Sequence, residues 1–234
     1  MTLQLSHRVP ILLKDCGSKR QLDQIHGLLL TSCLHRLPGL RALLVRRATE
    51  LGDMAHADLL FSSFRGADPP DAVALYNAMI RGCAYHGPHD RALDLFAEMT
   101  RRGDGLAPDS FTYPYVVDAC ARLMMWRGAE VVHCRVLKEG LDAVPAVGSS
   151  LLAFYVARGS LGDARRVFDG FSIKSVGLSN RMMSEYAKAR DIKSARELFD
   201  AMAERDVVSW NAMLTAYVKA ADLVQQRSCL RECL

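Results

Sequence analysis

The stretch "ARRVFD", residues 164–169, returns as "ARELFD" at residues 195–200, a step of 31 residues. Two further columns of residues keep the same step. One column is small and polar and the other is tyrosine: Ser149, Asn180 and Asn211, and Tyr155, Tyr186 and Tyr217. Because three independent columns share one register, we interpret this period as a structural repeat.

Divergent copies of the repeat extend over the whole chain. We number each copy so that its small polar residue stands at position 5: Asn77, Ser149, Asn180 and Asn211. Position 20 then holds a small residue, and position 24 a phenylalanine: Ala92, Ala164 and Ala195, and Phe96, Phe168 and Phe199. A copy that starts at Pro38 brings Ala57 and Phe61 into these two columns. The expected repeats span residues 6–37, 38–72, 73–109, 110–144, 145–175, 176–206 and 207–234, the first shortened and the last incomplete with a divergent tail.

Each repeat predicts two helices. Positions 3 to 14 carry apolar residues at three- and four-residue spacings, which favour an amphipathic helix. Position 15 is glycine in three copies, and position 16 holds a good N-cap for a second helix: Gly52, Gly87 and Gly159, then Asp53, Ser160, Asp191 and Asp222. One such pair cannot bury its own apolar faces, so neighbouring pairs must stack. The predicted fold is an all-α solenoid, with the alanine and phenylalanine columns between the helices and the three tyrosines inside.

The composition excludes several classes of protein. The formal net charge is +4, and no apolar stretch reaches the roughly 18 residues of a membrane-spanning helix. Motifs for metalloproteases, P-loops, serine hydrolases and dinucleotide binding are absent from the sequence. The seven cysteines form no CxxC pair, and we expect them to be buried, reduced thiols. We therefore predict no enzyme activity, no cofactor, no metal site and no membrane insertion.

The repeats resemble the pentatricopeptide repeat family of plants. "ALYNAMIRGCAYHGPHDRALDLFAEMTRRGDGLAPD", residues 74–109, resembles the family's standard long repeat, and "FTYPYVVDACARL", residues 111–123, its L variant. "SSLLAFYVARGSLGDARRVFDGF", residues 149–171, resembles the short S variant. This alternation is typical of the PLS subclass, and the resemblance implies a right-handed superhelix. The deaminase elements HxE and CxxC of the DYW domain are missing, so we expect a truncated member without E or DYW domains.

Asparagine at position 5 is a mediocre helix former, and yet "YNAMI", residues 76–80, nearly returns as "WNAML", residues 210–214. Two explanations remain open from the residues. In the first, the asparagine serves structure by capping or bridging neighbouring helices. Alternatively, a row of amides and hydroxyls at constant pitch can hydrogen-bond to the edges of successive unpaired bases.

The resemblance implies that position 5 and the last residue of a repeat together select a base, while an aliphatic residue near position 2 packs against it. Two pairs, Asn77 with Asp109 and Asn180 with Asp206, imply a preference for uridine. The pair of Ser149 and Ser175 has no assigned base. Asn211 belongs to the row without a partner, and Val208 fits the base-packing column. Pro114 with Val144 presents no amide. Ala42 occupies position 5 of its repeat, so no base is assigned to that repeat.

Two functional hypotheses follow. The first is a sequence-specific binder of single-stranded organellar RNA that acts in RNA modification, namely cytidine-to-uridine editing with a deaminase supplied by a partner protein. The resemblance favours the mitochondrion, with the chloroplast as alternative. The second is a scaffold for protein–protein interaction, as in the related tetratricopeptide repeats; a decayed, inactive copy is a third possibility. Regular polar residues at position 5 favour RNA.

Overall fold

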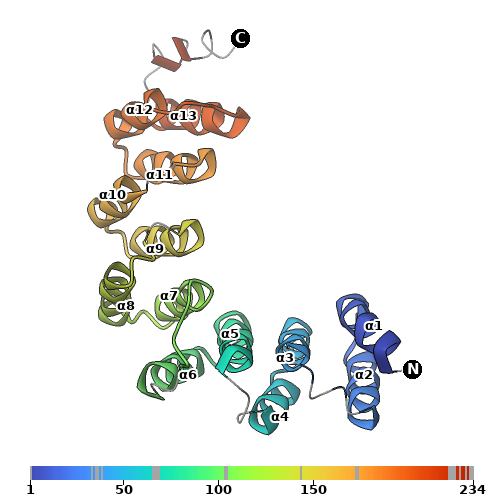
Figure 1. Cartoon of the computed structure of the whole chain (residues 1–234). Helices are drawn as coiled ribbons and strands as arrows, with labels where there is room; N and C mark the ends of the chain where they lie inside the picture. The colour runs from blue at the N-terminus through green and yellow to red at the C-terminus, as the bar shows by residue number, and fades with distance from the viewer. Residues whose placement is uncertain are drawn as a thin grey trace. The chain divides into compact units, whose positions relative to one another are not determined.

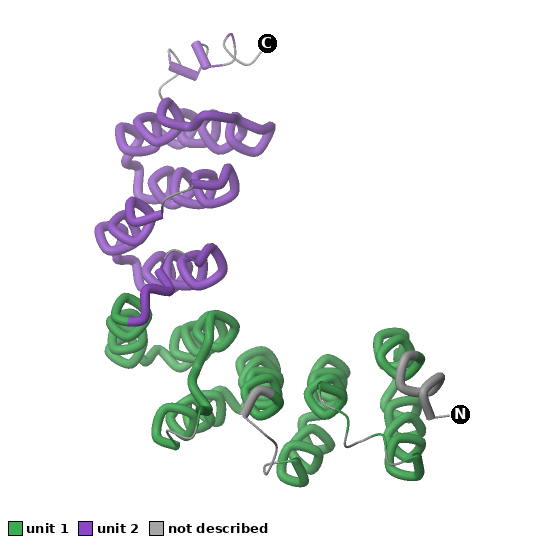
Figure 2. The backbone as a smooth tube through the Cα atoms, viewed as in Figure 1, with its two compact units in different colours: residues 1–138 green, residues 139–234 purple. Residues whose placement is uncertain are grey.

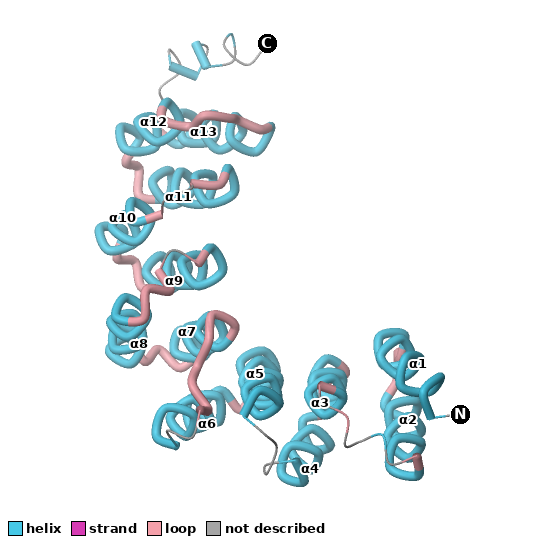
Figure 3. Tube along the Cα trace, viewed as in Figure 1, coloured by secondary structure: helices cyan, strands magenta, loops and turns pink. Residues whose placement is uncertain are grey.

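The computed structural model describes residues 2–32, 34, 37, 39–64, 69–102, 105–142, 144–171, 174–220, 225–226, 228–229 and 231. All regular secondary structure in these ranges is helical, which confirms the all-α prediction (Figures 1 and 3). The helices are α1 (Thr2–Asp15), α2 (Lys19–Thr31), α3 (Leu40–Glu50), α4 (Met54–Phe64), α5 (Pro69–His86), α6 (His89–Arg102), α7 (Thr112–Arg122), α8 (Trp126–Lys138), α9 (Pro145–Ala157), α10 (Leu161–Gly170), α11 (Val176–Lys188), α12 (Ile192–Asp200) and α13 (Val207–Lys219).

The chain forms two compact units, Met1–Lys138 and Glu139–Leu234 (Figure 2). In the first unit, each odd-numbered helix packs on the next even-numbered one, and α3, α5 and α7 also pack on one another in sequence. In the second unit, α9 packs on α10, α11 on α12, and α11 lies beside α13. Each unit is therefore a stack of helix pairs, as the solenoid prediction requires.

The alanine column is fully buried in both compact units. Ala57, Ala92, Ala164 and Ala195 have no exposed surface, and Ala129 occupies the same position 20 in the repeat of residues 110–144. A methyl side chain lets the second helix of a pair approach the first closely. The tyrosine column is buried as well, at Tyr155, Tyr186 and Tyr217. Both columns therefore serve packing.

The phenylalanine column is buried in three repeats and not in a fourth. Phe61, Phe168 and Phe199 are at most 1% exposed, whereas Phe96 is only half-buried, so its expected full burial is wrong. In α6 the neighbouring Leu95 and Met99 occupy the interior. The ring of Phe96 lies instead edge-on to Tyr113 (5.8 Å between centroids).

Position 15 ends the first helix in a left-handed conformation whether or not it is glycine. The φ angles are positive at Gly52, Gly87 and Gly159, and also at Met124 (54°) and Arg190 (59°). After Arg190, the backbone N–H of the next residue donates to the carbonyl of Tyr186, five residues earlier (2.9 Å). This hydrogen bond belongs to a Schellman C-cap, a helix ending that needs a left-handed residue.

Two of the four residues predicted to cap the second helices form the expected N-cap hydrogen bond. Asp53 and Asp191 each accept the backbone N–H of the third residue that follows (3.3 and 3.1 Å). Hydrogen bonds from the hydroxyl and the backbone N–H of Ser194 also lower the pKa of Asp191. Ser160 differs, because its hydroxyl donates to the carboxylate of Asp163 (2.6 Å) and makes no cap. Asp222 lies outside the described residues.

The cysteines are mostly buried, as predicted, with one exception. Cys16, Cys83, Cys120 and Cys229 are buried, and Cys33 and Cys233 lie outside the described residues. Burial raises the pKa of Cys83 to about 12, so this thiol is protonated at neutral pH. Cys134 is exposed, because α8 turns Val132 and Val136 inward instead.

Two groups of features are missing from the described residues. None of their helices combines the length and apolar character of a membrane span. Their histidines, cysteines and carboxylates form no cluster of three that could hold a metal ion.

Replacing Arg190 by glycine should stabilise the second unit by up to about 1 kcal/mol, because a side chain in the left-handed region is strained and glycine is not. The measurement is urea-induced unfolding followed by circular dichroism. Ala189, the preceding residue, has an ordinary right-handed φ of −76°. Ala189→Gly is therefore the matched control and should destabilise. Equal effects of the two substitutions would contradict the C-cap assignment.

Candidate nucleic-acid interface

The first predicted pair is in direct contact. Asn77 lies on α5, and Asp109 lies three residues before α7. The side-chain amide of Asn77 donates to Oδ1 of Asp109 (3.0 Å). The same oxygen accepts the backbone N–H groups of Phe111 (2.9 Å) and Thr112 (3.0 Å). Asp109 therefore opens the next helix and holds the asparagine of its own repeat.

The second pair has the same geometry in the other compact unit. The amide of Asn180 on α11 donates to Oδ1 of Asp206 (3.0 Å). Asp206 is the N-cap of α13 and accepts the backbone N–H of Ser209 (2.7 Å). The backbone N–H of Ser209, its hydroxyl and the Asn180 amide together lower the pKa of Asp206. Asp206 is therefore an ionised acceptor at neutral pH.

These contacts bear on the two explanations for asparagine at position 5. Both side chains bridge to the aspartate that starts the next helix, so the structural role is present. An amide nitrogen carries two N–H donors, and the bond to the aspartate uses one of them. Asn77 is half-buried, while Asn180 is 8% exposed and its Oδ1 has no hydrogen-bond partner among the described residues. Bridging therefore leaves polar capacity in both amides.

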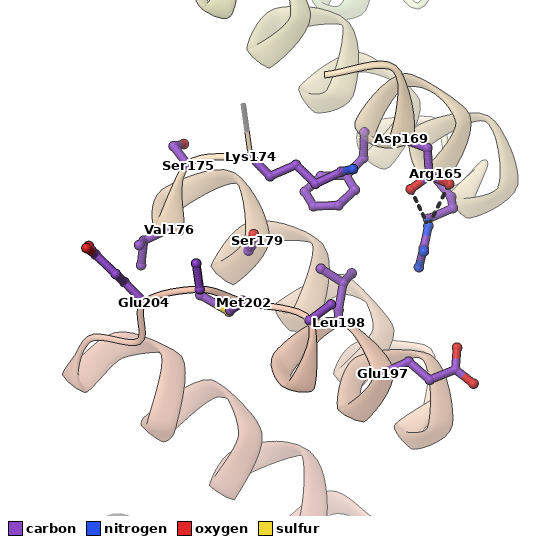
Figure 4. A pocket seen from close by; sticks show the side chains of 13 residues that line it. Arg165, Asp169, Lys174, Ser175, Val176, Ser179, Glu197, Leu198, Met202 and Glu204 are labelled. Atoms are coloured by element: carbon purple, nitrogen blue, oxygen red, sulfur yellow. Dashed lines mark hydrogen bonds and ion pairs between the residues drawn. The ribbon is translucent and has the colours of Figure 1, made fainter. Parts of the chain in front are cut away.

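Ser149 and Ser175 are not brought together. The hydroxyl of Ser149 donates to the carbonyl of Pro145 in its own helix (2.6 Å). Ser175 is the N-cap of α11 and accepts the backbone N–H of Leu178 (3.3 Å). It also lines a cavity of about 590 Å³ among residues of α10, α11 and α12, beside the ion pair of Arg165 and Asp169 (Figure 4).

Three predicted residues of the second unit share one hollow. Asn180, Val208 and Asn211 line a shallow cavity of about 260 Å³ between α11 and α13. The side chain of Val208 is 59% exposed, and that of Asn211 is exposed. The base-packing candidate thus lies next to two of the base-recognition candidates.

A larger groove of about 770 Å³ crosses α3, α5 and the start of α7. Asn77 and Asp109 line it, together with Phe111, which is 70% exposed. Phe111 was not among the predicted site residues, because its repeat has Pro114 in place of an amide. Phe111 nevertheless stands at position 2 of its repeat, as Val208 does, and this position was the sequence signal that could have identified it. The groove therefore pairs a polar site with an exposed aromatic ring.

One wall of this groove carries an arginine cluster. Glu50 accepts hydrogen bonds from Arg81 (2.8 Å), Arg47 (2.9 Å) and Arg46 (3.0 Å), and Arg46 and Arg81 line the groove. Burial opposes ionisation of Glu50, but these three hydrogen bonds outweigh it and lower the pKa to about 2. Three guanidinium groups around one carboxylate leave net positive charge beside the groove, which suits an anionic ligand.

The arginine cluster around Glu50 should make the stability of the protein depend on pH. The pKa of Glu50 in the folded state, about 2, lies below the ordinary value of 4.5. Its contribution is therefore complete above about pH 4.5 and is lost as the pH falls toward about 2. We expect Glu50→Gln to lower the urea midpoint at neutral pH and to match the wild type near the acid end. A difference independent of pH would contradict this assignment.

The comparisons with known proteins agree with the repeat geometry. A family model described as "PPR repeat family" matches residues 70–122, and one described as "PPR repeat" matches residues 179–207 and 208–224. A pentatricopeptide repeat-containing protein of Arabidopsis thaliana is 34% identical over 165 residues, which cover 70% of this chain and 29% of the relative. A second Arabidopsis relative, named as chloroplastic/mitochondrial, is 28% identical over 180 residues, or 75% of this chain and 27% of the relative. The chain thus spans less than a third of the length of these two curated relatives.

Among solved structures, the crystal structure of the pentatricopeptide repeat protein PPR10 in complex with an 18-nt psaJ RNA element superposes with a TM-score of 0.74. The sequences are 17% identical, and the match covers 96% of this chain and 35% of PPR10. This likeness shows the fold: the chain is a helical-repeat solenoid. With the family matches, its repeats are pentatricopeptide repeats of the plant type.

Proposed function

We propose that this protein binds single-stranded RNA and reads bases with its asparagine–aspartate pairs. The observation that carries the proposal is the recurrence of one geometry in two repeats. In each, an asparagine at position 5 is held by the last residue of its repeat, at the edge of a hollow that also exposes an apolar side chain from position 2 of the next repeat. Amides beside exposed apolar or aromatic groups suit unstacked bases.

The chemistry of the pair favours uridine. The aspartate holds one N–H of the amide, and the other N–H can donate to a base edge. Uracil offers a carbonyl oxygen at C4, where cytosine carries an amino donor. A fixed N–H donor can therefore hydrogen-bond to the uracil carbonyl oxygen, whereas it meets another donor in cytosine. We assign Asn77 with Asp109 and Asn180 with Asp206 to uridine, and leave Ser149 with Ser175 without a base.

We further propose the repeat boundaries given above, membership of the PLS subclass, and a role in cytidine-to-uridine editing. A partner protein would supply the deaminase, and the RNA would be organellar. The alternation of repeat variants and the relative named as chloroplastic/mitochondrial support these assignments. We favour the mitochondrion over the chloroplast, and imaging of a fluorescent fusion of the natural protein in plant cells tests that choice.

Selection of bound RNAs from a random pool tests the proposed function. At one base per repeat, two repeats lie between those of Asn77 and Asn180. The selected RNAs should therefore carry uridine at two places separated by two nucleotides. Affinity should fall with added salt, because phosphate contacts release counterions. Indifference to all four bases, or capture of peptides in place of RNA, would favour the scaffold hypothesis.

Asn180→Ala should weaken the uridine preference at one of the two places only, by roughly 1 kcal/mol, because one base-edge hydrogen bond is lost. Competition between oligomers that differ at a single base, at fixed salt, measures the change. Ser149→Ala is the matched control, since that hydroxyl bonds its own helix, and it should leave both preferences intact. If asparagine serves packing alone, Asn180→Ala should instead weaken all RNAs equally.

A further inference from the structure

A buried hydroxyl accompanies each asparagine–aspartate pair. Thr112 and Ser209 both occupy position 3 of the repeat that follows the pair, and neither has exposed surface. A buried hydroxyl in an otherwise apolar column costs free energy unless it is hydrogen-bonded. Its partners therefore show what it does.

At the first pair the hydroxyl contacts both members. Thr112 Oγ1 lies 2.6 Å from Oδ1 of Asn77 and 3.0 Å from Oδ1 of Asp109. It also accepts the backbone N–H of Asp109 (3.0 Å). The shorter contact assigns the hydroxyl proton to Asn77. Thr112 thus fixes which way round the amide lies, with its oxygen toward α7 and its nitrogen toward the aspartate.

At the second pair the hydroxyl contacts the aspartate alone. Ser209 Oγ donates to Oδ1 of Asp206 (2.8 Å) and accepts the backbone N–H of Asp206 (3.2 Å). Oδ1 of Asn180 is left without a partner among the described residues. At this pair the aspartate accepts the hydroxyl, as at the first pair, but the amide is held at its nitrogen end only.

Repeats that lack this hydroxyl also lack the bridge. The residue at position 3 after Ser175 is Leu178, and among the described residues no hydrogen bond joins Ser149 to Ser175. The residue at position 3 after Val144 is Val147, in a repeat whose position 5 is Pro114. A buried hydroxyl at position 3 therefore occurs with the Asn–Asp pair and is absent beside the other two combinations.

We propose that Thr112 and Ser209 are positioning residues for base recognition, so that each reading group is an Asn–Asp–hydroxyl triad spread over two consecutive repeats. This inference rests on the proposed function. The triad holds the free N–H of the amide in one direction before RNA binds, which reduces the ordering cost of binding. Because Thr112 also fixes the amide oxygen, the Asn77 group discriminates bases more sharply than the Asn180 group.

The test compares Thr112→Val, which keeps the shape and removes the hydroxyl, with Thr112→Ser, which keeps the hydroxyl. The probes are RNA oligomers with uridine, or each other base, at one of the two places. Thr112→Val should reduce the uridine preference at the Asn77 place by about two- to tenfold, the range of one net hydrogen bond. It should leave the Asn180 place unchanged. Thr112→Ser should retain the preference, and Ser209→Ala should act at the Asn180 place alone.

The preference is a ratio of affinities measured on the same folded molecules, so a loss of stability in Thr112→Val does not imitate the effect. Thermal unfolding of each variant is measured together with its base preference. If the wild type prefers uridine and Thr112→Val keeps that preference, the positioning role is wrong and the proposed function stands. If the wild type shows no preference at either place, both are overturned.

Discussion

Phe199→Ala should lower the free energy of unfolding by about 3–5 kcal/mol, the usual cost of removing a fully buried aromatic ring. The ring is 1% exposed and lies at the contact of α12 with α13. Trp210 meets it edge-on at 4.8 Å between centroids, and the guanidinium carbon of Arg205 lies 4.8 Å from its centroid. The guanidinium of Arg196 also lies over this ring, at 5.7 Å from the centroid. The variant therefore loses buried area and three oriented contacts, and it leaves a cavity between two repeats.

Urea unfolding followed by circular dichroism measures this loss. A repeat array can unfold in parts, so the midpoint and the slope must both be compared with the wild type. Phe111→Ala is the matched control, because that ring is 70% exposed, and it should change stability by less than about 0.5 kcal/mol. A loss below about 1 kcal/mol for Phe199→Ala would show that this ring does not join the repeats.

Gly82→Ala should destabilise the first unit by about 1–3 kcal/mol through overpacking. A Cβ at Gly82 on α5 would lie 2.6 Å from Cβ and 2.4 Å from Cγ2 of Thr49 on α3. Thr49 is buried, and its Cβ is fixed to the backbone, so rotation of the side chain cannot relieve the contact. The two helices must separate instead.

Gly27→Ala is the matched control in the same compact unit. Gly27 lies inside α2, and a Cβ there meets no atom within 4 Å. Alanine is the better helix former, so this variant should gain up to about 1 kcal/mol. Thermal unfolding measures the stability of Gly82→Ala and Gly27→Ala against the wild type. If Gly82→Ala is as stable as the wild type, the close approach of α3 and α5 is not required.

The sequence predicted those features that depend on periodicity. The alanine and tyrosine columns recur at a fixed step, and a repeated environment buries each of the named alanines and tyrosines. Periodicity does not predict which of two adjacent apolar residues turns inward, because a small rotation of the helix decides it. Phe96 was expected to be buried and is half-buried, whereas its neighbour Leu95 is buried. Arg190 was missed similarly, since only glycine marks a left-handed position in a sequence.

The candidate site was predicted in part. The family resemblance paired Asn77 with Asp109 and Asn180 with Asp206, and the structure places each pair in hydrogen-bond contact. The buried hydroxyls could not be found, because position 3 mixes apolar with polar residues, and only contacts distinguish Thr112 from a packing residue. Phe111 was missed because its repeat has Pro114 in place of an amide at position 5, although Phe111 stands at position 2, as Val208 does.

Under the proposed function, the two roles of the last residue in a repeat limit how the protein can change its RNA target. Asp206 holds Asn180 and also initiates α13, so under the proposed function one residue governs both base specificity and folding. A mutation there that removed the N-cap would cost about 1 kcal/mol before any new base was recognised. The usable alphabet at this place is therefore short: aspartate, asparagine, serine and threonine, the side chains that can start a helix. Val144 falls outside that alphabet, and its helix begins on Pro145 instead.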